Sequence, residues 1–231
     1  MVSAEEVGTA LRRIADRLGA AGILTPEGQG VLAGEAGRIR RGRDSHAWRL
    51  AIDRGRPLTF ARTLDKNGIE VTPSIVVDSI EAAPPGERAP PFTRLDMALE
   101  VHDLAGEPVA RWHLDLANSG PARIQDGPLF HLQYGGHNQG ARHLDHPLKG
   151  PRWCHPPMEV GLFCEMVAAN FFCETWKRDL RDDAGWCSAV QTLQRLCYNS
   201  YLAMLQASLD RSASTALADM WADRWPPPEL T

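Results

Sequence analysis

The stretch PVARWHLDLA, residues 108–117, alternates between apolar and polar side chains over most of its length. Successive side chains of a β-strand point to opposite faces, so this stretch predicts a strand with one apolar and one polar face. Such a strand is typical of an antiparallel sheet that carries helices on one face only. The predicted apolar face holds Ala110, Trp112, Leu114 and Leu116, and the predicted polar face holds Arg111, His113 and Asp115.

Two neighbouring stretches repeat this alternation. In residues 94–103 the apolar set is Leu95, Met97, Leu99 and Val101, and the polar set is Asp96, Glu100 and His102. In residues 128–134 one face holds Phe130, Leu132 and Tyr134, and the other holds Leu129, His131 and Gln133. Turn-forming residues separate further strand-like stretches, which are expected at 46–53, 57–63 and 69–80.

Helices are expected before and after these strands in the sequence. Ser3 and Glu6 have the spacing of a capping box, and the apolar residues that follow at helical spacing predict a helix ending near Gly19. Residues 25–43 contain a good helix start but many glycines, so they receive no firm assignment. From residue 156 onward three helices are expected, the first of them apolar on every face and therefore buried.

Together these patterns predict a single α+β domain. Its fold is expected to comprise an N-terminal helix, an antiparallel sheet of about five or six strands, and three C-terminal helices packed on one sheet face. The expected segments are a basic helical segment at 1–44, the sheet at 45–135, a loop at 136–155, the helices at 156–225 and a tail at 226–231.

The composition of the 231-residue chain is that of an ordinary globular protein, with 43% apolar residues and a net charge of −4. No apolar run reaches the roughly 18 residues that a membrane span requires, so a cytoplasmic protein without a membrane partner is expected. The five cysteines include no C-x₂₋₄-C pair, and no nucleotide-binding motif is present. We therefore expect reduced thiols and no cofactor.

The predicted polar face contains the candidate catalytic residues His113, Asp115 and His131. A carboxylate beside an imidazole raises its basicity, and a second imidazole can act as an acid to the first. This set is typical of phosphodiester cleavage through a ribose 2′-hydroxyl. The same three residues could instead bind manganese or zinc, or they could belong to an ordinary solvent-facing sheet surface. Candidate substrate-binding residues are Arg111, Gln133 and His155.

A second candidate interface is the basic run that contains Arg38, Arg40, Arg41 and Arg43. Clustered arginines bind the phosphates of nucleic acids. The overall charge is −4, however, so the run is better interpreted as scattered solvated arginines.

Several short motifs lie in a characteristic order between residues 112 and 172. They are Trp112-His113-Leu114-Asp115, then Phe130-His131-Leu132-Gln133-Tyr134, then Pro156-Pro157-Met158 and a helix ending in Asn170-Phe171-Phe172. This order resembles uncharacterised bacterial families associated with toxin–antitoxin and phage-defence systems, including the TumE-like toxins. Those families carry His-x-His in the second strand, where this chain has Gln133 as the later residue. The resemblance implies a bacterial cytoplasmic protein that acts on RNA.

Two functions follow from these observations. The first is a ribonuclease-like component of a toxin–antitoxin or phage-defence system, acting through His113, Asp115 and His131. The second is a non-catalytic subunit or interaction module of a larger complex, with a protein partner from the same operon. Trp221, Trp225 and the proline tail Pro226–Pro228 suggest the second function, because terminal aromatic clusters can anchor partners.

Overall fold

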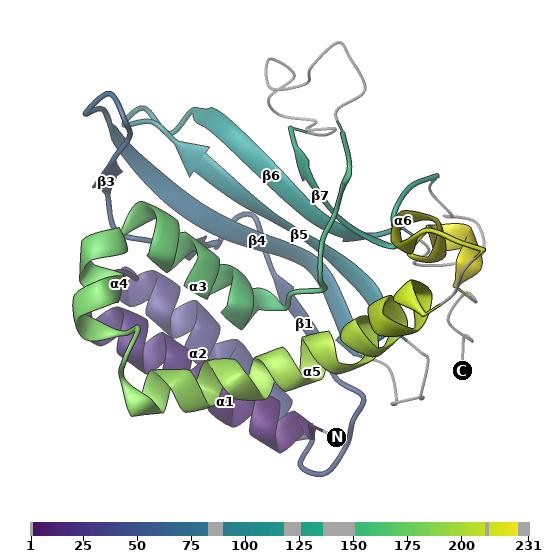
Figure 1. Cartoon of the computed structure of the whole chain (residues 1–231). Helices are drawn as coiled ribbons and strands as arrows, with labels where there is room; N and C mark the ends of the chain where they lie inside the picture. The colour runs from purple at the N-terminus through teal and green to yellow at the C-terminus, as the bar shows by residue number, and fades with distance from the viewer. Residues whose placement is uncertain (1, 83–89, 118–125, 136–150, 211–212, 226–231) are drawn as a thin grey trace.

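An antiparallel sheet with helices on one face forms the centre of the computed structural model (Figure 1). The structure describes residues 2–82, 90–117, 126–135, 151–210 and 213–225. The sheet order is β1-β4-β5-β6-β7-β8, and β2 and β3 also pair with β4. The strands are β1 (Arg49–Ile52), β2 (Leu58–Thr59), β3 (Thr63–Leu64), β4 (Glu70–Ala82), β5 (Phe92–His102), β6 (Pro108–Leu116), β7 (Phe130–Tyr134) and β8 (Trp153–Cys154).

Two N-terminal helices form where one was expected. The predicted capping box is present at the start of α1 (Ala4–Ala20), where Ser3 and Glu6 each accept a hydrogen bond from the other's backbone N–H. The glycine-rich segment forms α2 (Pro26–Arg40), capped by Thr25. A Cβ atom at Gly28 would lie 2.2 Å from the carbonyl oxygen of Thr59. At this position, glycine permits the close approach of α2 to β2.

Two strand predictions need correction. The stretch expected as one strand at 57–63 contributes two separate short strands, β2 and β3, each paired with β4. The end of the expected loop 136–155 forms β8, which pairs with β7 in the register Leu132 to Trp153. Residues 136–150 of that loop lie outside the described residues. The remaining strands form close to their predicted positions.

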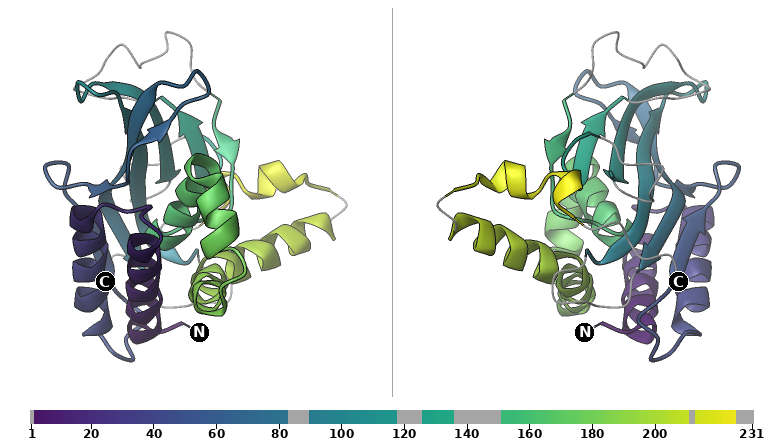
Figure 2. Two further views of the ribbon diagram at one scale, coloured as in Figure 1. Left: turned by 90° about the vertical axis from the view of Figure 1, so that its left-hand side faces the viewer. Right: turned by 90° about the vertical axis from the view of Figure 1, so that its right-hand side faces the viewer.

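The C-terminal part of the chain is helical, as expected, but its described residues form four α-helices where three were predicted. The helices are α3 (Val160–Phe171), α4 (Cys173–Asp179), α5 (Ala184–Leu209) and α6 (Ala216–Asp219), followed by a 3₁₀ turn at Ala222–Arg224. Phe172 leaves the helical conformation and separates α3 from α4. Figure 2 shows the C-terminal half of α5 and α6 projecting from the rest of the fold. None of the described helices has the length and apolar character needed to cross a membrane.

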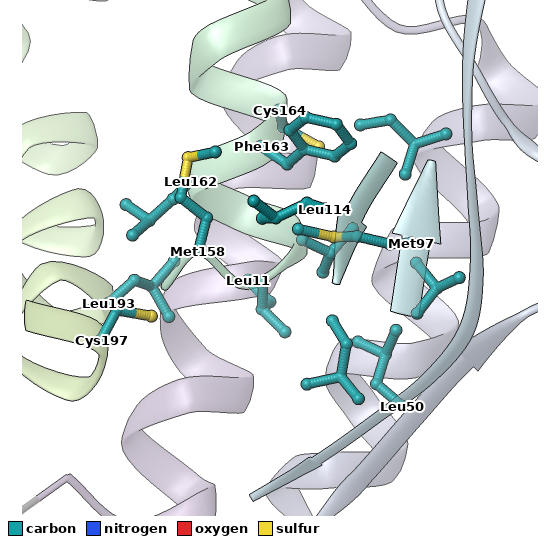
Figure 3. Close-up of a cluster of buried hydrophobic side chains, with 14 of the residues drawn as sticks. Leu11, Leu50, Met97, Leu114, Met158, Leu162, Phe163, Cys164, Leu193 and Cys197 are labelled. Atoms are coloured by element: carbon teal, nitrogen blue, oxygen red, sulfur yellow. The ribbon is translucent and has the colours of Figure 1, made fainter. Parts of the chain in front are cut away.

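One contiguous apolar core joins the helices to the sheet. Side chains from several elements meet in Figure 3, including Leu11 of α1, Met97 of β5, Leu114 of β6, Phe163 of α3 and Leu193 of α5. Each of these five side chains is almost completely buried. The predicted apolar faces of β5, β6 and β7 therefore lie toward the helices, and the opposite faces of these strands carry the polar residues.

A buried carboxylate begins α3. Glu159 is fully buried, and its side chain accepts hydrogen bonds from the backbone N–H groups of Gly161 and Leu162, both at 2.8 Å. These two donors have no partner within the helix, since they belong to its first turn. Burial nevertheless raises the pKa of Glu159 to about 7, because the apolar surroundings disfavour the charged form.

We expect Glu159→Ala to lower the free energy of unfolding by about 2 kcal/mol, because it leaves two buried N–H groups unpaired. Urea unfolding followed by circular dichroism measures the loss. Glu159→Gln is the control, since its amide oxygen can still accept from the helix, and it should lose less. Equal stability of the alanine variant and the wild type would show that the cap contributes nothing.

Candidate functional site

The polar residues of β5, β6 and β7 are arranged in cross-strand rows. The pairing of the three strands places Asp96, Asp115 and His131 side by side in one row. The next row holds Ala98, His113 and Gln133, and the row after it pairs Glu100 with Arg111. All of these side chains share the face opposite the helical core. The predicted catalytic residues His113, Asp115 and His131 are therefore brought together.

Two carboxylates face each other in the first row. Asp96 and Asp115 are directly opposed across β5 and β6, an arrangement that is unfavourable when both are charged. Asp78 adds a third negative charge from a β-bulge in β4, where the pairing shifts between Val77 and Ser79. Burial and the charge of Asp96 raise the pKa of Asp115 to about 7. Burial and the charge of Asp78 raise the pKa of Asp96 as well.

His113 lies in the adjacent row, beside these carboxylates, and is half-buried. One ring nitrogen of His113 and one carboxylate oxygen from each of Asp96 and Asp115 lie within 4.8 Å of one another. His113 and Asp115 are two positions apart in β6, which fixes them on the same face. An imidazole and two carboxylates at this separation can exchange a proton or coordinate a cation.

His131 is fully buried at the end of the first row. Its Nδ1 lies 3.2 Å from the carbonyl oxygen of Pro128, and because a carbonyl oxygen only accepts, Nδ1 carries the proton. Its Nε2 lies 3.8 Å from Oδ2 of Asp115. Burial lowers the pKa of His131 to about 4, so the ring is neutral near pH 7. His131 therefore presents a lone pair, not a charge, toward Asp115.

Arg111 belongs to a separate, balanced group of charges. Its side chain is buried, and its Nε lies 3.3 Å from Oε1 of Glu100. Arg54, which follows β1, places Nη1 2.9 Å from the same oxygen. Two guanidinium groups thus share one carboxylate. Arg111 was a candidate substrate-binding residue, but the structure places it in this ion-pair group, with little of its surface exposed.

The other candidate substrate-binding residues lie around the strand β7. Gln133 is opposite His113, and its Oε1 lies 3.5 Å from Nε of Arg152, a residue the sequence analysis did not select. His155 follows β8, and its Nδ1 lies 2.6 Å from the carbonyl oxygen of Pro156. The structure brings Gln133 to the site, and among the described residues it shows no hydrogen bond between His155 and the site.

The predicted nucleic-acid-binding arginines lie elsewhere in the fold. Arg38 and Arg40 are in the last turns of α2, and Arg41 and Arg43 are in the turn that follows. All four are exposed, and Arg38 forms an ion pair with Glu35. Because α2 belongs to the helical layer, this basic run does not join the polar face of the sheet. The structure does not bring the two candidate sites together.

The C-terminal aromatic residues contribute to the fold. Trp225 is buried, and Trp221 donates a hydrogen bond from Nε1 to Oδ1 of Asp126 at 2.9 Å. The backbone N–H of Leu129 donates to the carbonyl oxygen of Met220, which ties this segment to the start of β7. Residues 226–231, which contain the predicted proline tail, lie outside the described residues.

Scans against protein-family models, curated proteins and solved structures find no match to this chain.

Sequence reasoning missed Asp78, Asp96 and Arg152 as members of the site. The alternation in β5 places Asp96 on the polar face, but it gives no indication that Asp96 lies opposite Asp115. Asp78 reaches the site through a bulge, which breaks the alternation. Arg152 comes from the segment before β8, whose pairing with β7 the sequence did not indicate.

The raised pKa of Asp115 predicts a measurable pH dependence of stability. The folded state holds a proton on this carboxyl up to about pH 7, whereas the unfolded chain releases it near pH 4. The contribution of Asp115 to the free energy of unfolding should therefore decrease as the pH rises from about 4 to 7, whereas the lowered pKa of His131 contributes in the opposite direction between about pH 4 and 6.5. The charged groups that act on Asp115 are Asp78, Asp96, Arg111 and Arg152.

We expect Asp115→Asn to be more stable than the wild type at pH 8 by about 2 kcal/mol, because the amide cannot ionise. At pH 4 the two proteins should differ little. Urea unfolding in EDTA at both pH values measures the difference, and taking the difference cancels the contribution of Glu159. Asp44→Asn, in an exposed turn, is the control and should leave the pH dependence unchanged. A pH-independent difference between Asp115→Asn and wild type would contradict the expected repulsion.

Proposed function

We propose that this protein is a ribonuclease-like component of a bacterial toxin–antitoxin or phage-defence system, and that it cleaves RNA on the polar face of β5, β6 and β7. The observation that carries the proposal is the placement of His113 beside Asp96 and Asp115 on a face opposite the core. The resemblance of residues 112–172 to TumE-like toxins supports RNA as the substrate.

Cleavage of RNA through its 2′-hydroxyl joins that oxygen to phosphorus and breaks the bond to the 5′-oxygen, so it needs a base for the hydroxyl proton, an acid that protonates the leaving 5′-oxygen, and positive charge near the phosphate. Asp115, whose pKa is raised to about 7, can supply the proton to the leaving oxygen. His113 is half-buried and is the more accessible of the two histidines in the first two rows. Arg152 borders the site beside Gln133 and provides a guanidinium that suits a phosphate. His113 and Asp115 are needed whether His113 acts as a base or as the ligand of a cation.

His131 has a different place in this proposal from that expected of a second catalytic histidine. It is fully buried, and its pKa is lowered to about 4, so it does not supply an imidazolium at neutral pH. Its Nε2 is directed at Asp115. We therefore assign it a positioning role, holding the carboxylate of Asp115 beside His113.

His113→Ala and Asp115→Asn should each reduce RNA cleavage by the purified full chain by about 100-fold or more, since general acid–base groups contribute on this scale. Growth inhibition on expression should be lost in parallel, and the melting temperature should not fall. His102→Ala is the matched control, because His102 lies at the end of β5 on the same face but beside Glu100. Full cleavage in both site variants would reject the proposal.

The alternative of a non-catalytic interaction module has less support from the C-terminal segment. Trp225 and Met220 are buried, so these residues stabilise the fold and offer little surface to a partner. Deleting residues 219–231 would therefore disturb folding, and it is not a clean test of partner binding. A pull-down that uses the folded His113→Ala variant tests this alternative, because partner binding would survive there while cleavage is lost.

A further inference from the structure

We propose that Asp96, His113 and Asp115 bind a divalent transition-metal cation, Mn²⁺ or Zn²⁺, between β5 and β6. This site shares residues with the proposed ribonuclease site, but binding of the cation does not require RNA cleavage. The set differs from the one considered from sequence, in which His131 stood in the place of Asp96.

The three donor atoms come from a rigid part of the fold. One carboxylate oxygen from each aspartate and one ring nitrogen of His113 lie within 4.8 Å of one another. Ligands that bind a cation at about 2.1 Å lie about 3–4 Å apart, so small side-chain rotations bring the three atoms into range. Asp96 and Asp115 are held opposite each other by the pairing of β5 with β6, and His113 is held by its position in β6.

An independent observation at His131 indicates a ligand at the same place. This side chain is fully buried, and among the described residues its Nε2 makes no hydrogen bond. Because Nδ1 donates to Pro128, Nε2 presents a lone pair to Oδ2 of Asp115 at 3.8 Å. A lone pair that faces a carboxylate is unfavourable unless a proton or a cation accompanies the carboxylate. A cation on Asp115 removes this conflict and leaves Nε2 able to accept a hydrogen bond from a water on the metal.

The distribution of charge on the face favours a cation at this position. The carboxylates of Asp78, Asp96 and Asp115 repel one another when they are charged. The nearest buried guanidinium, that of Arg111, is already engaged with Glu100. A divalent cation would compensate the negative charges of this row, which the ion pairs around Glu100, two rows away, leave unbalanced.

The donor types indicate which cations are suited to this site. Carboxylate oxygens suit Mg²⁺, Ca²⁺ and Mn²⁺, whereas an imidazole nitrogen suits Zn²⁺, Mn²⁺ and other transition metals. Two oxygens and one nitrogen therefore favour Mn²⁺ or Zn²⁺ over Mg²⁺. Three protein ligands leave coordination positions for water, as in catalytic metal sites.

Titration of the full chain, stripped with EDTA and dialysed, tests the site. Isothermal titration calorimetry with Mn²⁺ and separately with Zn²⁺ should show saturable binding of one equivalent, together with a rise in melting temperature. Asp96→Asn and His113→Gln should each weaken binding by more than about tenfold. Asp96→Asn removes a like-charge contact, so it should fold at least as well as the wild type. His102→Gln is the matched control and should bind as the wild type does.

The outcomes separate this site from the proposed ribonuclease. If the wild type binds neither cation, or if Asp96→Asn binds as tightly as the wild type, the cation site is overturned. If RNA cleavage persists in EDTA and calorimetry detects no binding of either cation, the cation site is rejected and the ribonuclease proposal is left intact. Saturable binding that Asp96→Asn and His113→Gln abolish, without any RNA cleavage, would support the site and count against the ribonuclease.

Discussion

Burial of one face of β5, β6 and β7 against the helical core is the constraint on which the rest of this structure depends. Met97 and Leu114 pack toward α1 and α3, and this packing fixes the register of the three strands. A slip by one residue would move every apolar side chain to the opposite face, so the register has no freedom to adjust. The positions of the polar residues on the other face follow from this register.

One consequence is that the fold keeps an unfavourable contact. Asp96 and Asp115 are opposed because Met97 and Leu114, their neighbours in the two strands, are paired in the core. Separating the two carboxylates would require unpacking those apolar residues, which costs more than the repulsion between two partly solvated charges. Local rules of stability are broken most often at functional sites. The polar face of this sheet breaks such a rule where three candidate ligands meet.

The features of this fold and site that depend on residues close in sequence could be predicted, and those that depend on contacts between distant residues could not. Alternation is a local property, so the faces of β5, β6 and β7 and the placement of His113, Asp115 and His131 on one face could be predicted. The helix α2 could not be predicted, because Gly28 weakens the helical pattern. The close approach that Gly28 permits is to Thr59, which is distant in sequence. The role of Asp96 depends on strand register, which is set by the packing of Met97 and Leu114 in the core and not by the alternation within one strand. The burial of His131 and its bond to Pro128 depend on tertiary packing that no local pattern encodes.

The pairing of β5 with β6 produces two rows of charged residues on the polar face, one that contains Glu100 and one that contains Asp115. The charges are balanced in the first row and repel one another in the second. Glu100 in one row meets two guanidinium groups, those of Arg54 and Arg111, so the protein itself supplies the counter-charge. Asp115, two rows along the face, meets another carboxylate and the lone pair of a neutral imidazole. The sheet thus gives Glu100 two close guanidinium partners, whereas the positive charges of Arg111 and Arg152 offset only part of the repulsion at Asp115. This contrast makes a positively charged ligand, or a proton in transfer, the simplest physical explanation of the Asp96–Asp115 row.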